Sequence, residues 1–370
     1  MKVFFVLLFM VIVTAAGTSP APSTVKAAYW PAWLNSTFPP SAIDTSYFTH
    51  LYYAFLQPDP ATFGLLITES DDFWMDKFNS DLHNCKHSVG TILSIGGGAS
   101  DHTLFANIAA YPSHRRDFIK STIETGRKYG FDGLDLDWEY PADQKEMDDL
   151  GQLLEEWRVE IVKETWASGR RPLLLTAAVY YSVVNPLDGV TRVYPVGSIS
   201  SNLDWINAMC FDYRGAWDTT ATGAHAALFD PNSQISTSSG ITSWLDAGVP
   251  SNKIVMGLPL FGHTWKLKDP HVNRIGAPAV DVGPGDEGTM SFAEIVDFNK
   301  ENEASVVYDK ATVSTYSYVG TSWISYDGPK SVRKKIKFAR AHRLAGYFFW
   351  AVAGDKDWKI SRQASKTWDD

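Results

Sequence analysis

The sequence is poor in cysteine and has no excess of positive charge. Two cysteines, Cys85 and Cys210, stand beside strand-like runs that are not neighbours. We therefore expect both to be buried and unpaired, with a disulfide as the alternative in an exported protein. So few cysteines and scattered histidines show no metal-ligand spacing, and we predict neither a metal nor another cofactor. The net charge of −9 supplies no basic patch for phosphates, which argues against a nucleic-acid partner.

Long hydrophobic runs are also scarce. One apolar run, Val3 to Val13, follows Lys2 and precedes the small residues of Thr14-Ala15-Ala16-Gly17, which is the pattern of a signal peptide over residues 1–20. The run is shorter than the ~20 residues that a membrane span needs, and no second such run follows. The sequence thus predicts a soluble, secreted, extracellular protein without a membrane partner, and we expect it to be a monomer. A lone sequon at Asn35 is compatible with export.

Short apolar runs, in contrast, recur along the chain with helical patterns between them. One intervening segment carries a clear amphipathic stripe from Leu150 to Ile161 and ends at Ser168-Gly169, as a helix should. Strands that alternate with helices pair in parallel, and eight such units predict an α/β fold, the (β/α)8 TIM barrel. An open doubly wound sheet is the alternative, but no glycine fingerprint follows the first run. The eight runs begin near Lys26, Phe48, Val89, Gly130, Pro172, Leu203, Lys253 and Leu344.

One interval breaks this rhythm. From about Lys266 to Gly328 the sequence lacks a helical period and shows short strand-like runs such as SVVYD and TYSYV. We interpret residues 266–328 as a small α+β insertion domain after the seventh strand, with the barrel formed by 24–265 and 329–366. Such an insertion would build one wall of a cleft at the C-terminal face, where barrel enzymes place their sites.

The fourth run contains a column of acids. Read with the period of a strand, FDGLDLDWEYP places Asp135, Asp137 and Glu139 on one face and apolar residues on the other. In a barrel the apolar face meets the helices, so the carboxylates point into the interior. Burying charges costs several kcal/mol each unless they are paired, protonated or used in chemistry. The pattern therefore indicates a catalytic strand rather than a solvated acidic stripe.

The column also suggests separate roles for its members. Carboxylates at close range cannot all ionise, so at least one keeps its proton to a higher pH. Glu139 ends the strand at the catalytic face and is the natural general acid for a leaving oxygen. Asp137 can orient a substrate group, and Asp135 can share a proton with Asp137. Asp132 is out of phase with the others and is expected to support the base of the strand.

The spacing Asp132, Asp135, Asp137, Glu139 resembles the DxxDxDxE signature of family-18 chitinases. Ser94-Ile95-Gly96-Gly97 is similar to the SxGG element of their third strand, and the likeness to plant class V chitinases extends over nearly the whole mature chain. The resemblance implies a glycoside hydrolase that acts on chitin or chitooligosaccharides by substrate-assisted retaining catalysis. In that mechanism Glu139 is the acid and base, and Asp137 stabilises an oxazolinium ion formed by the substrate's own acetamido group.

The resemblance also implies a set of substrate-binding positions. Met209 and Asp212 match the family's MxYD element on the sixth strand, and Trp350 matches the tryptophan under the sugar at the cleavage site. For Phe55 and Met209, packing in the core is an equally good interpretation. The predicted substrate-binding residues are Tyr29, Phe55, Tyr140, Met209, Asp212, Tyr213 and Trp350.

One position departs from the family pattern, because Phe211 stands where MxYD has its tyrosine. In the family that hydroxyl bonds the acetamido oxygen, and loss of such a bond can cost ~2–4 kcal/mol in the transition state. Tyr213 lies one strand step further along and cannot simply replace it. A lectin-like chitin-binding protein with weak or no activity is therefore one alternative, and a hydrolase of lipo-chitooligosaccharide (Nod factor) signals is another. An inhibitor of other glycosidases would need a blocking loop, for which the sequence gives no sign.

Overall fold

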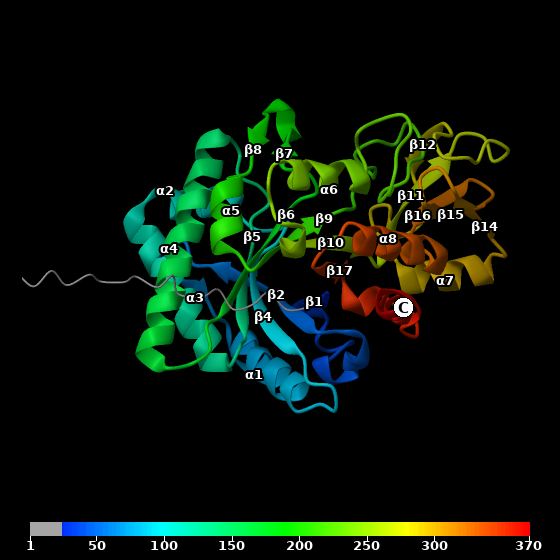
Figure 1. Cartoon of the computed structure of the whole chain (residues 1–370). Helices are drawn as coiled ribbons and strands as arrows, with labels where there is room; N and C mark the ends of the chain where they lie inside the picture. The colour runs from blue at the N-terminus through cyan, green and yellow to red at the C-terminus, as the bar shows by residue number, and fades with distance from the viewer. Residues whose placement is uncertain (1–23) are drawn as a thin grey trace, which may run out of the picture.

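The computed structural model describes residues 24–370, so the predicted signal peptide lies outside the described part of the chain. Eight parallel strands form a ring in which β1 pairs with both β17 and β2 (Figure 1). The ring closes the barrel that the eight apolar runs predict, and this prediction is confirmed. Its strands are β1 (Val25–Pro31), β2 (His50–Pro58), β4 (Gly90–Gly96), β5 (Gly133–Asp137), β6 (Leu174–Tyr180), β9 (Trp205–Met209), β10 (Ile254–Pro259) and β17 (Gly346–Trp350).

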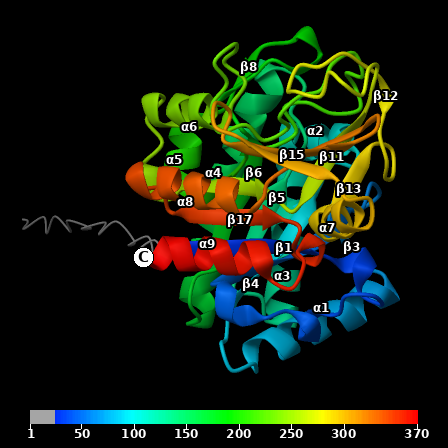
Figure 2. The ribbon, with the colours of Figure 1, turned by 90° about the vertical axis from the view of Figure 1, so that its right-hand side faces the viewer.

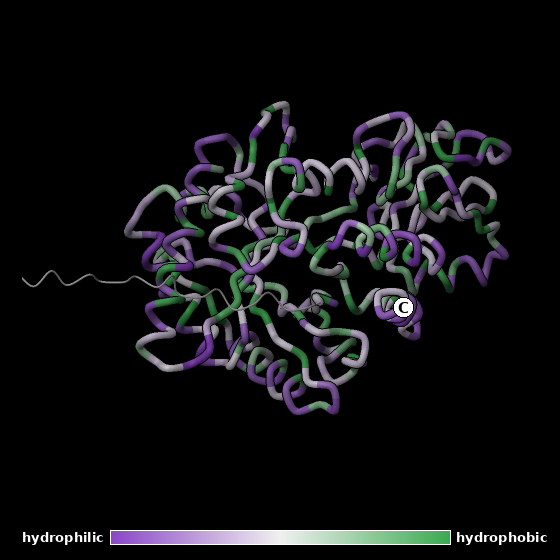
Figure 3. Tube along the Cα trace, viewed as in Figure 1, coloured by the Kyte–Doolittle hydropathy of each residue, from purple (hydrophilic) through white to green (hydrophobic). Residues whose placement is uncertain are grey.

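Helices surround this ring, and α4 shows why they form where they do. Its apolar stripe from Leu150 to Ile161 is buried, and Gly169 ends the helix in a left-handed conformation that glycine adopts without strain. Hydrophilic residues gather on outward-facing segments such as α1 (Figure 3). The helices are α1 (Glu69–His83), α2 (His102–Ala110), α3 (Pro112–Tyr129), α4 (Gln144–Ser168), α5 (Val196–Asn202), α6 (Thr237–Asp246), α8 (Pro329–Ala341) and α9 (Lys359–Asp369).

A second, antiparallel sheet lies between β10 and β17 in the sequence and beside the barrel in space (Figure 1). Trp265 and Trp323 centre its own small apolar cluster. The strand β11 runs across the predicted boundary at residue 266, and the division into domains stays a prediction. The elements are β11 (Phe261–Leu267), β12 (Ala279–Val282), β13 (Thr289–Ser291), α7 (Phe292–Glu301), β14 (Ser305–Asp309), β15 (Ser314–Val319) and β16 (Ser322–Tyr326).

Short elements decorate the loops at the strand ends. The two-residue strand β3 (Leu65–Leu66) pairs antiparallel with the end of β2, while β7 (Val184–Asn185) and β8 (Arg192–Val193) form a separate hairpin after β6. This hairpin projects beyond the barrel at the top of Figure 1. Single 3-10 turns occur at Ala32–Leu34, Pro40–Ala42, Thr45–Tyr47, Leu187–Gly189, Ser251–Lys253 and Val352–Gly354.

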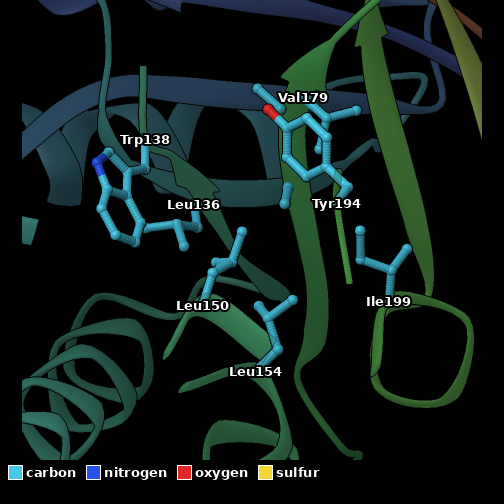
Figure 4. Close-up of a pocket in the computed structure, with 9 residues that line it drawn as sticks. Leu136, Trp138, Leu150, Leu154, Val179, Tyr194 and Ile199 are labelled. Atoms are coloured by element: carbon cyan, nitrogen blue, oxygen red, sulfur yellow. The ribbon is translucent and has the colours of Figure 1, made fainter. Parts of the chain in front are cut away.

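The two faces of β5 meet different surroundings. Leu136, and Trp138 just beyond the strand, point outward beside Leu150 and Leu154 of α4 (Figure 4), so the acids lie on the inward face. A cavity of about 10 Å³ remains between these apolar side chains. Such a volume holds at most about one water molecule. The cavity is therefore a packing gap between sheet and helices and is far too small for a sugar.

The ends of the described chain meet on one side of the barrel (Figure 2). Lys26 of β1 forms an ion pair of 2.6 Å with Asp369 of α9, and the Trp368 indole donates a hydrogen bond of 3.3 Å to Thr24. The last helix thus closes over the first strand. Among the helices of residues 24–370, none has the length and apolar character to cross a membrane.

Both cysteines are free thiols, as the sequence predicts. Cys210 is buried, but Cys85 is only partly buried, so the prediction of burial is wrong for Cys85. The reason is its place in the loop after α1, where its thiol lies 3.0 Å from the Leu82 carbonyl oxygen at the surface. That loop position is not part of the strand that follows.

Candidate active site

Asp135 occupies the interior of the barrel at the middle of β5 and is fully buried. Its carboxylate accepts hydrogen bonds from the hydroxyls of Thr176 (2.6 Å), Ser94 (2.7 Å) and Tyr29 (3.0 Å). Burial raises its pKa, and these donors oppose the rise. Because its oxygens are occupied by donors from three other strands, Asp135 fixes the geometry of the barrel floor.

Asp137 lies one strand step above Asp135 and is also buried. Its Oδ1 has no hydrogen-bond partner among the described residues, which is unusual because buried carboxylate oxygens are nearly always satisfied. Burial raises the pKa of Asp137 well above its usual range, and the charges of Glu139 and Asp135 raise it further. A protonated or substrate-bound Asp137 would remove this unfavourable state.

Glu139 follows the end of β5 at the C-terminal rim of the barrel and is partly exposed. Burial raises its pKa to about 6; the Tyr140 hydroxyl lowers the pKa, and the charge of Asp212 raises it. A carboxyl group with this pKa keeps its proton in mildly acidic solution and can deliver it to a leaving group. The three acids therefore stand in three different environments along one strand.

Two glycines at the end of β4 make room for this column. A Cβ at Gly96 would lie 2.1 Å from the Asp137 carbonyl oxygen, and one at Gly97 would lie 2.5 Å from the Phe55 ring. Both glycines also have positive φ, 116° and 89°, which side chains other than glycine rarely adopt. The SxGG element thus couples β4 to β5 directly, because Ser94 bonds Asp135 while Gly96 admits the backbone of Asp137.

Aromatic rings form one side of the site. Trp350 at the end of β17 stacks on Phe55 with ring centroids 5.6 Å apart, and Phe55 in turn stacks on Trp33 at 6.3 Å. Trp33 is 60 % exposed, so the row opens to solvent. Tyr29 lies beneath it, only 1 % exposed, with its hydroxyl on Asp135. The structure therefore favours a supporting role for Tyr29 over direct contact with a ligand.

The side chains at the end of β9 point in different directions, some toward the site and some into the core. Met209 is partly exposed, and Asp212 adopts a left-handed backbone (φ 59°) with a side chain that is 47 % exposed. Phe211 is buried among Phe348 and Phe261. Tyr213 points into the core, where its hydroxyl lies 3.1 Å from that of Thr237. The structure thus brings Asp212 and Met209 to the site and favours a packing role for Tyr213.

Two histidines next to Asp212 are absent from the sequence prediction. His263 Nε2 lies 2.8 Å from Asp212 Oδ1, and His225 Nδ1 lies 3.9 Å from the same oxygen. The floor of the site desolvates Asp212, which raises its pKa, but the two imidazoles outweigh this and lower the pKa to about 2. No sequence motif links these residues, because β10 and a long loop separate them along the chain.

Tyr180, Asn207 and Trp33 also belong to the site but were not predicted from the sequence. Tyr140 packs edge-on against Tyr180 at the end of β6, with ring centroids 5.7 Å apart. Asn207 of β9 donates to the Tyr29 hydroxyl at 2.9 Å. Trp33 could have been noticed, because it follows Tyr29 by four residues in a stretch that ends the first strand. Tyr180 and Asn207 carry no such signal.

Comparison with known proteins identifies the family of this chain and its fold. The model of the glycosyl hydrolases family 18 matches residues 25–355. The chain belongs to this family. Membership confirms the resemblance drawn from Asp132 to Glu139 and makes the protein a glycoside hydrolase of family 18 with a barrel fold.

Relatives of this glycosyl hydrolase span nearly its whole length. The class V chitinase CHIT5 of Lotus japonicus is 52% identical over 350 residues, which cover 94% of this chain and 87% of that protein. Nod factor hydrolase protein 1 of Medicago truncatula is 50% identical, with 93% and 90% covered. Two solved structures bear on function: the class V chitinase of Nicotiana tobaccum in complex with NAG4 (TM-score 0.89, 42% identity, 93% and 99% covered) and a chitinase-like agglutinin of Robinia pseudoacacia (TM-score 0.86, 37%, 93% and 100%).

Proposed function

We propose that this family-18 protein is a chitinase that hydrolyses the β-1,4 bonds of N-acetylglucosamine polymers or oligomers with retention of configuration. The observation that carries the proposal is the inward column on β5, in which Glu139 has a pKa of about 6 and Asp137 keeps a buried oxygen without a partner. An acid able to hold its proton and a neighbouring acceptor are the two groups that substrate-assisted cleavage requires. No second carboxylate nucleophile is needed, because the substrate provides the attacking oxygen.

In the proposed first step Glu139 protonates the glycosidic oxygen while the carbonyl oxygen of the substrate's 2-acetamido group attacks the anomeric carbon. The C–O bond to the leaving sugar breaks, and a cyclic oxazolinium ion forms. In the second step Glu139, now a carboxylate, takes a proton from water as that water attacks the anomeric carbon and reopens the ring. The carboxyl group thus returns to its protonated form, and the sugar keeps its original configuration.

Asp137 is the proposed partner of the acetamido N–H. Its Oδ1, which has no hydrogen-bond partner among the described residues, supports this role, because an N–H donor would satisfy this buried acceptor. As positive charge develops on the oxazolinium ion, the negative charge of Asp137 would stabilise it more than the neutral substrate, which is the requirement for catalysis. Asp135, held by three hydroxyl donors, would position Asp137 from below.

The aromatic row of Trp33, Phe55 and Trp350 is the proposed platform for the sugar rings. Its offset-stacked faces present flat apolar surface next to the acids, which suits the apolar face of a pyranose ring. Solved relatives with bound chitooligosaccharides support this class of ligand. Met209, Asp212 and Tyr140 complete the proposed contacts around the cleavage site.

The test is incubation of the purified protein with chitohexaose, with products followed by mass spectrometry. We expect shorter oligomers from the parent, and a rate lower by about 10²–10⁴ for Glu139→Gln, since general acid–base groups contribute factors of this size. Glu155→Gln, which removes an exposed carboxylate of α4, is the matched control and should retain full activity. Cleavage that survives Glu139→Gln would exclude this mechanism.

A lectin-like function is a second candidate, favoured by Phe211 and by the likeness to the Robinia agglutinin. It predicts retained binding to chitin beads without cleavage of chitohexaose. The complete acid column argues against it, because binding alone gains nothing from a carboxyl group tuned to a pKa of about 6.

Hydrolysis of acylated chitooligosaccharides is a narrower form of the main proposal. The β7–β8 hairpin supports it, because Val184, Leu187, Val190 and Val193 are all exposed on a segment that continues directly from β6 and Tyr180. An aliphatic surface of this kind suits an acyl chain attached to the sugar. A kcat/KM higher for the lipid-bearing oligomer than for the same oligomer without its acyl chain would support this narrower substrate.

A further inference from the structure

Three side chains converge at one edge of the cleft, and two of them, both histidines, have no role in the proposed hydrolytic mechanism. Asp212, after β9, His225, in the loop toward α6, and His263, on β11, place their ligand-type atoms within 4.8 Å of one another. The two imidazole rings meet edge to face, with centroids 5.1 Å apart. The carboxylate is 47 % exposed and the histidines are buried, so the cluster is open to solvent on one side only.

The state of His225 is the strongest sign that this cluster takes a ligand. Its side chain is 1 % exposed, and neither ring nitrogen has a hydrogen-bond partner in residues 24–370. Asp212 Oδ1 lies 3.9 Å from the His225 Nδ1, which is too far for a hydrogen bond. A buried imidazole with two unsatisfied nitrogens is costly, and such groups in native proteins call for an explanation.

The second histidine is already oriented. His263 directs Nε2 toward Asp212, while its Nδ1 lies 3.4 Å from the Thr289 hydroxyl of β13. A contact of the second ring nitrogen with a polar partner is the usual arrangement behind a metal-bound histidine, because it fixes the ring and its tautomer. Thr289 thus occupies the place of an outer-shell residue.

We propose that Asp212, His225 and His263 form a binding site for a late first-row divalent cation such as Zn²⁺. Two imidazoles with one carboxylate are a known three-residue ligand set for zinc that leaves a fourth position open. The nitrogen donors favour Zn²⁺, Cu²⁺ or Ni²⁺ over Mg²⁺ and Ca²⁺, which prefer oxygen ligands. Bonds of about 2.0–2.1 Å put tetrahedral ligand atoms roughly 3.3 Å apart. Side-chain rotations that move these atoms by about 1 Å would therefore bring them to the separation that a bound ion needs.

A cation bound at this site would affect catalysis, because the site lies at the cleft. Asp212 acts electrostatically on Glu139 and stands at the cleft. A cation bound to Asp212 would fill part of the substrate's space and would engage the carboxylate that the substrate contacts. We therefore expect reversible inhibition that is competitive with the oligosaccharide. This consequence rests on the proposed chitinase function, whereas metal binding itself does not.

The experiment is calorimetric titration of the chelator-treated, tag-free mature protein with ZnCl₂, supported by the visible absorption of tetrahedral Co²⁺. We expect one ion per chain, and at least a tenfold weaker Kd in each of His225→Gln, His263→Gln and Asp212→Asn. His271→Gln removes an exposed histidine of the second sheet's loop and should bind as tightly as the parent. Circular dichroism of each variant separates lost ligands from a lost fold, and Asp212→Asn, on the exposed side of the cluster, tests the site even where a buried variant fails to fold.

Two results would overturn the site: no heat of Zn²⁺ binding to the parent, or equal affinity in the parent and all three ligand variants. Loss of activity in His263→Gln without any metal binding by the parent would instead assign the histidines to positioning Asp212. Zinc binding by a protein that does not cleave chitohexaose would leave the site standing and reject the chitinase proposal. Zinc binding without inhibition would reject only the competitive consequence.

Discussion

Phe211 is the residue where this chain and the signature of its family part. Its ring is buried against Phe348 and Phe261 and has no hydroxyl to donate. Phe211→Tyr should raise kcat on chitohexaose by about tenfold or more, because removal of a single oxyanion donor costs factors of about 10²–10³. Tyr213→Phe is the matched control: its hydroxyl bonds Thr237 in the core, so it should change stability by ~1 kcal/mol and leave kcat nearly unchanged. Equal rates for the Phe211→Tyr variant and the parent would show that the missing hydroxyl limits nothing.

Glu139 is the single residue that we expect to set the pH dependence of the activity. The proposed acid works only while protonated, and burial raises its pKa from 4.5 to about 6. We therefore expect kcat/KM, which reports the free enzyme, to fall as pH rises through about 6. The Tyr140 hydroxyl lowers this pKa and the charge of Asp212 raises it, while Glu139 in turn raises the pKa of Asp137. Tyr140→Phe should thus move the alkaline limb to higher pH, and a shift to lower pH in a full pH–rate profile would contradict this assignment.

The predictability of single residues follows how they are connected. Asp135, Asp137 and Glu139 could be found from the sequence, because strand period alone puts them on one face. His225 and His263 could not be found, because they reach Asp212 from separate segments and each is an isolated histidine in its own context. The side-chain directions of Tyr29 and Tyr213 were equally inaccessible, since both follow from packing against distant strands.

At the scale of the elements, the junction between β4 and β5 is the most constrained. Gly96→Ala should destabilise the protein by roughly 3 kcal/mol or more, because it combines backbone strain at φ 116° with a Cβ 2.1 Å from the Asp137 carbonyl oxygen. Gly169→Ala, at the end of α4, shares the positive φ but has nothing within 4 Å, so it should cost only ~1 kcal/mol. Urea unfolding of both variants separates the two contributions. Similar losses for both would mean that strain alone, without the close approach, governs Gly96.

Barrel strands were predictable because their apolar runs are short, rich in β-branched and aromatic residues, and separated by helical patterns. The residue at which the insertion begins was harder to predict. Phe261 begins β11 only two residues after β10 ends at Pro259, and the run KIVMGLPLFG reads through both strands without a break. Tertiary pairing with β16 and β13, rather than local sequence, decides where the chain leaves the barrel.

At the scale of the whole molecule, two ion pairs join the second sheet to the barrel and differ in burial. Lys335 of α8 bonds Asp327, which follows β16, and also the Ala226 carbonyl oxygen, and both charged side chains are 1 % exposed. Lys356, before α9, pairs with Asp297 of α7 at 2.8 Å, and their side chains are 35 % and 50 % exposed. The second sheet is therefore linked to the barrel by one buried ion pair and by one ion pair that solvent reaches.

These pairs should respond differently to mutation. Lys335→Met leaves a buried carboxylate without its partner and should cost about 3–5 kcal/mol, whereas the double variant Lys335→Met/Asp327→Leu should recover much of that loss, since buried pairs rarely outweigh their desolvation. Lys356→Met should cost no more than about 1 kcal/mol, because exposed pairs are screened and mobile. Thermal unfolding of the parent and the three variants measures these losses. A double variant that is no more stable than Lys335→Met would contradict the expectation that most of the loss comes from leaving the Asp327 carboxylate buried without its partner.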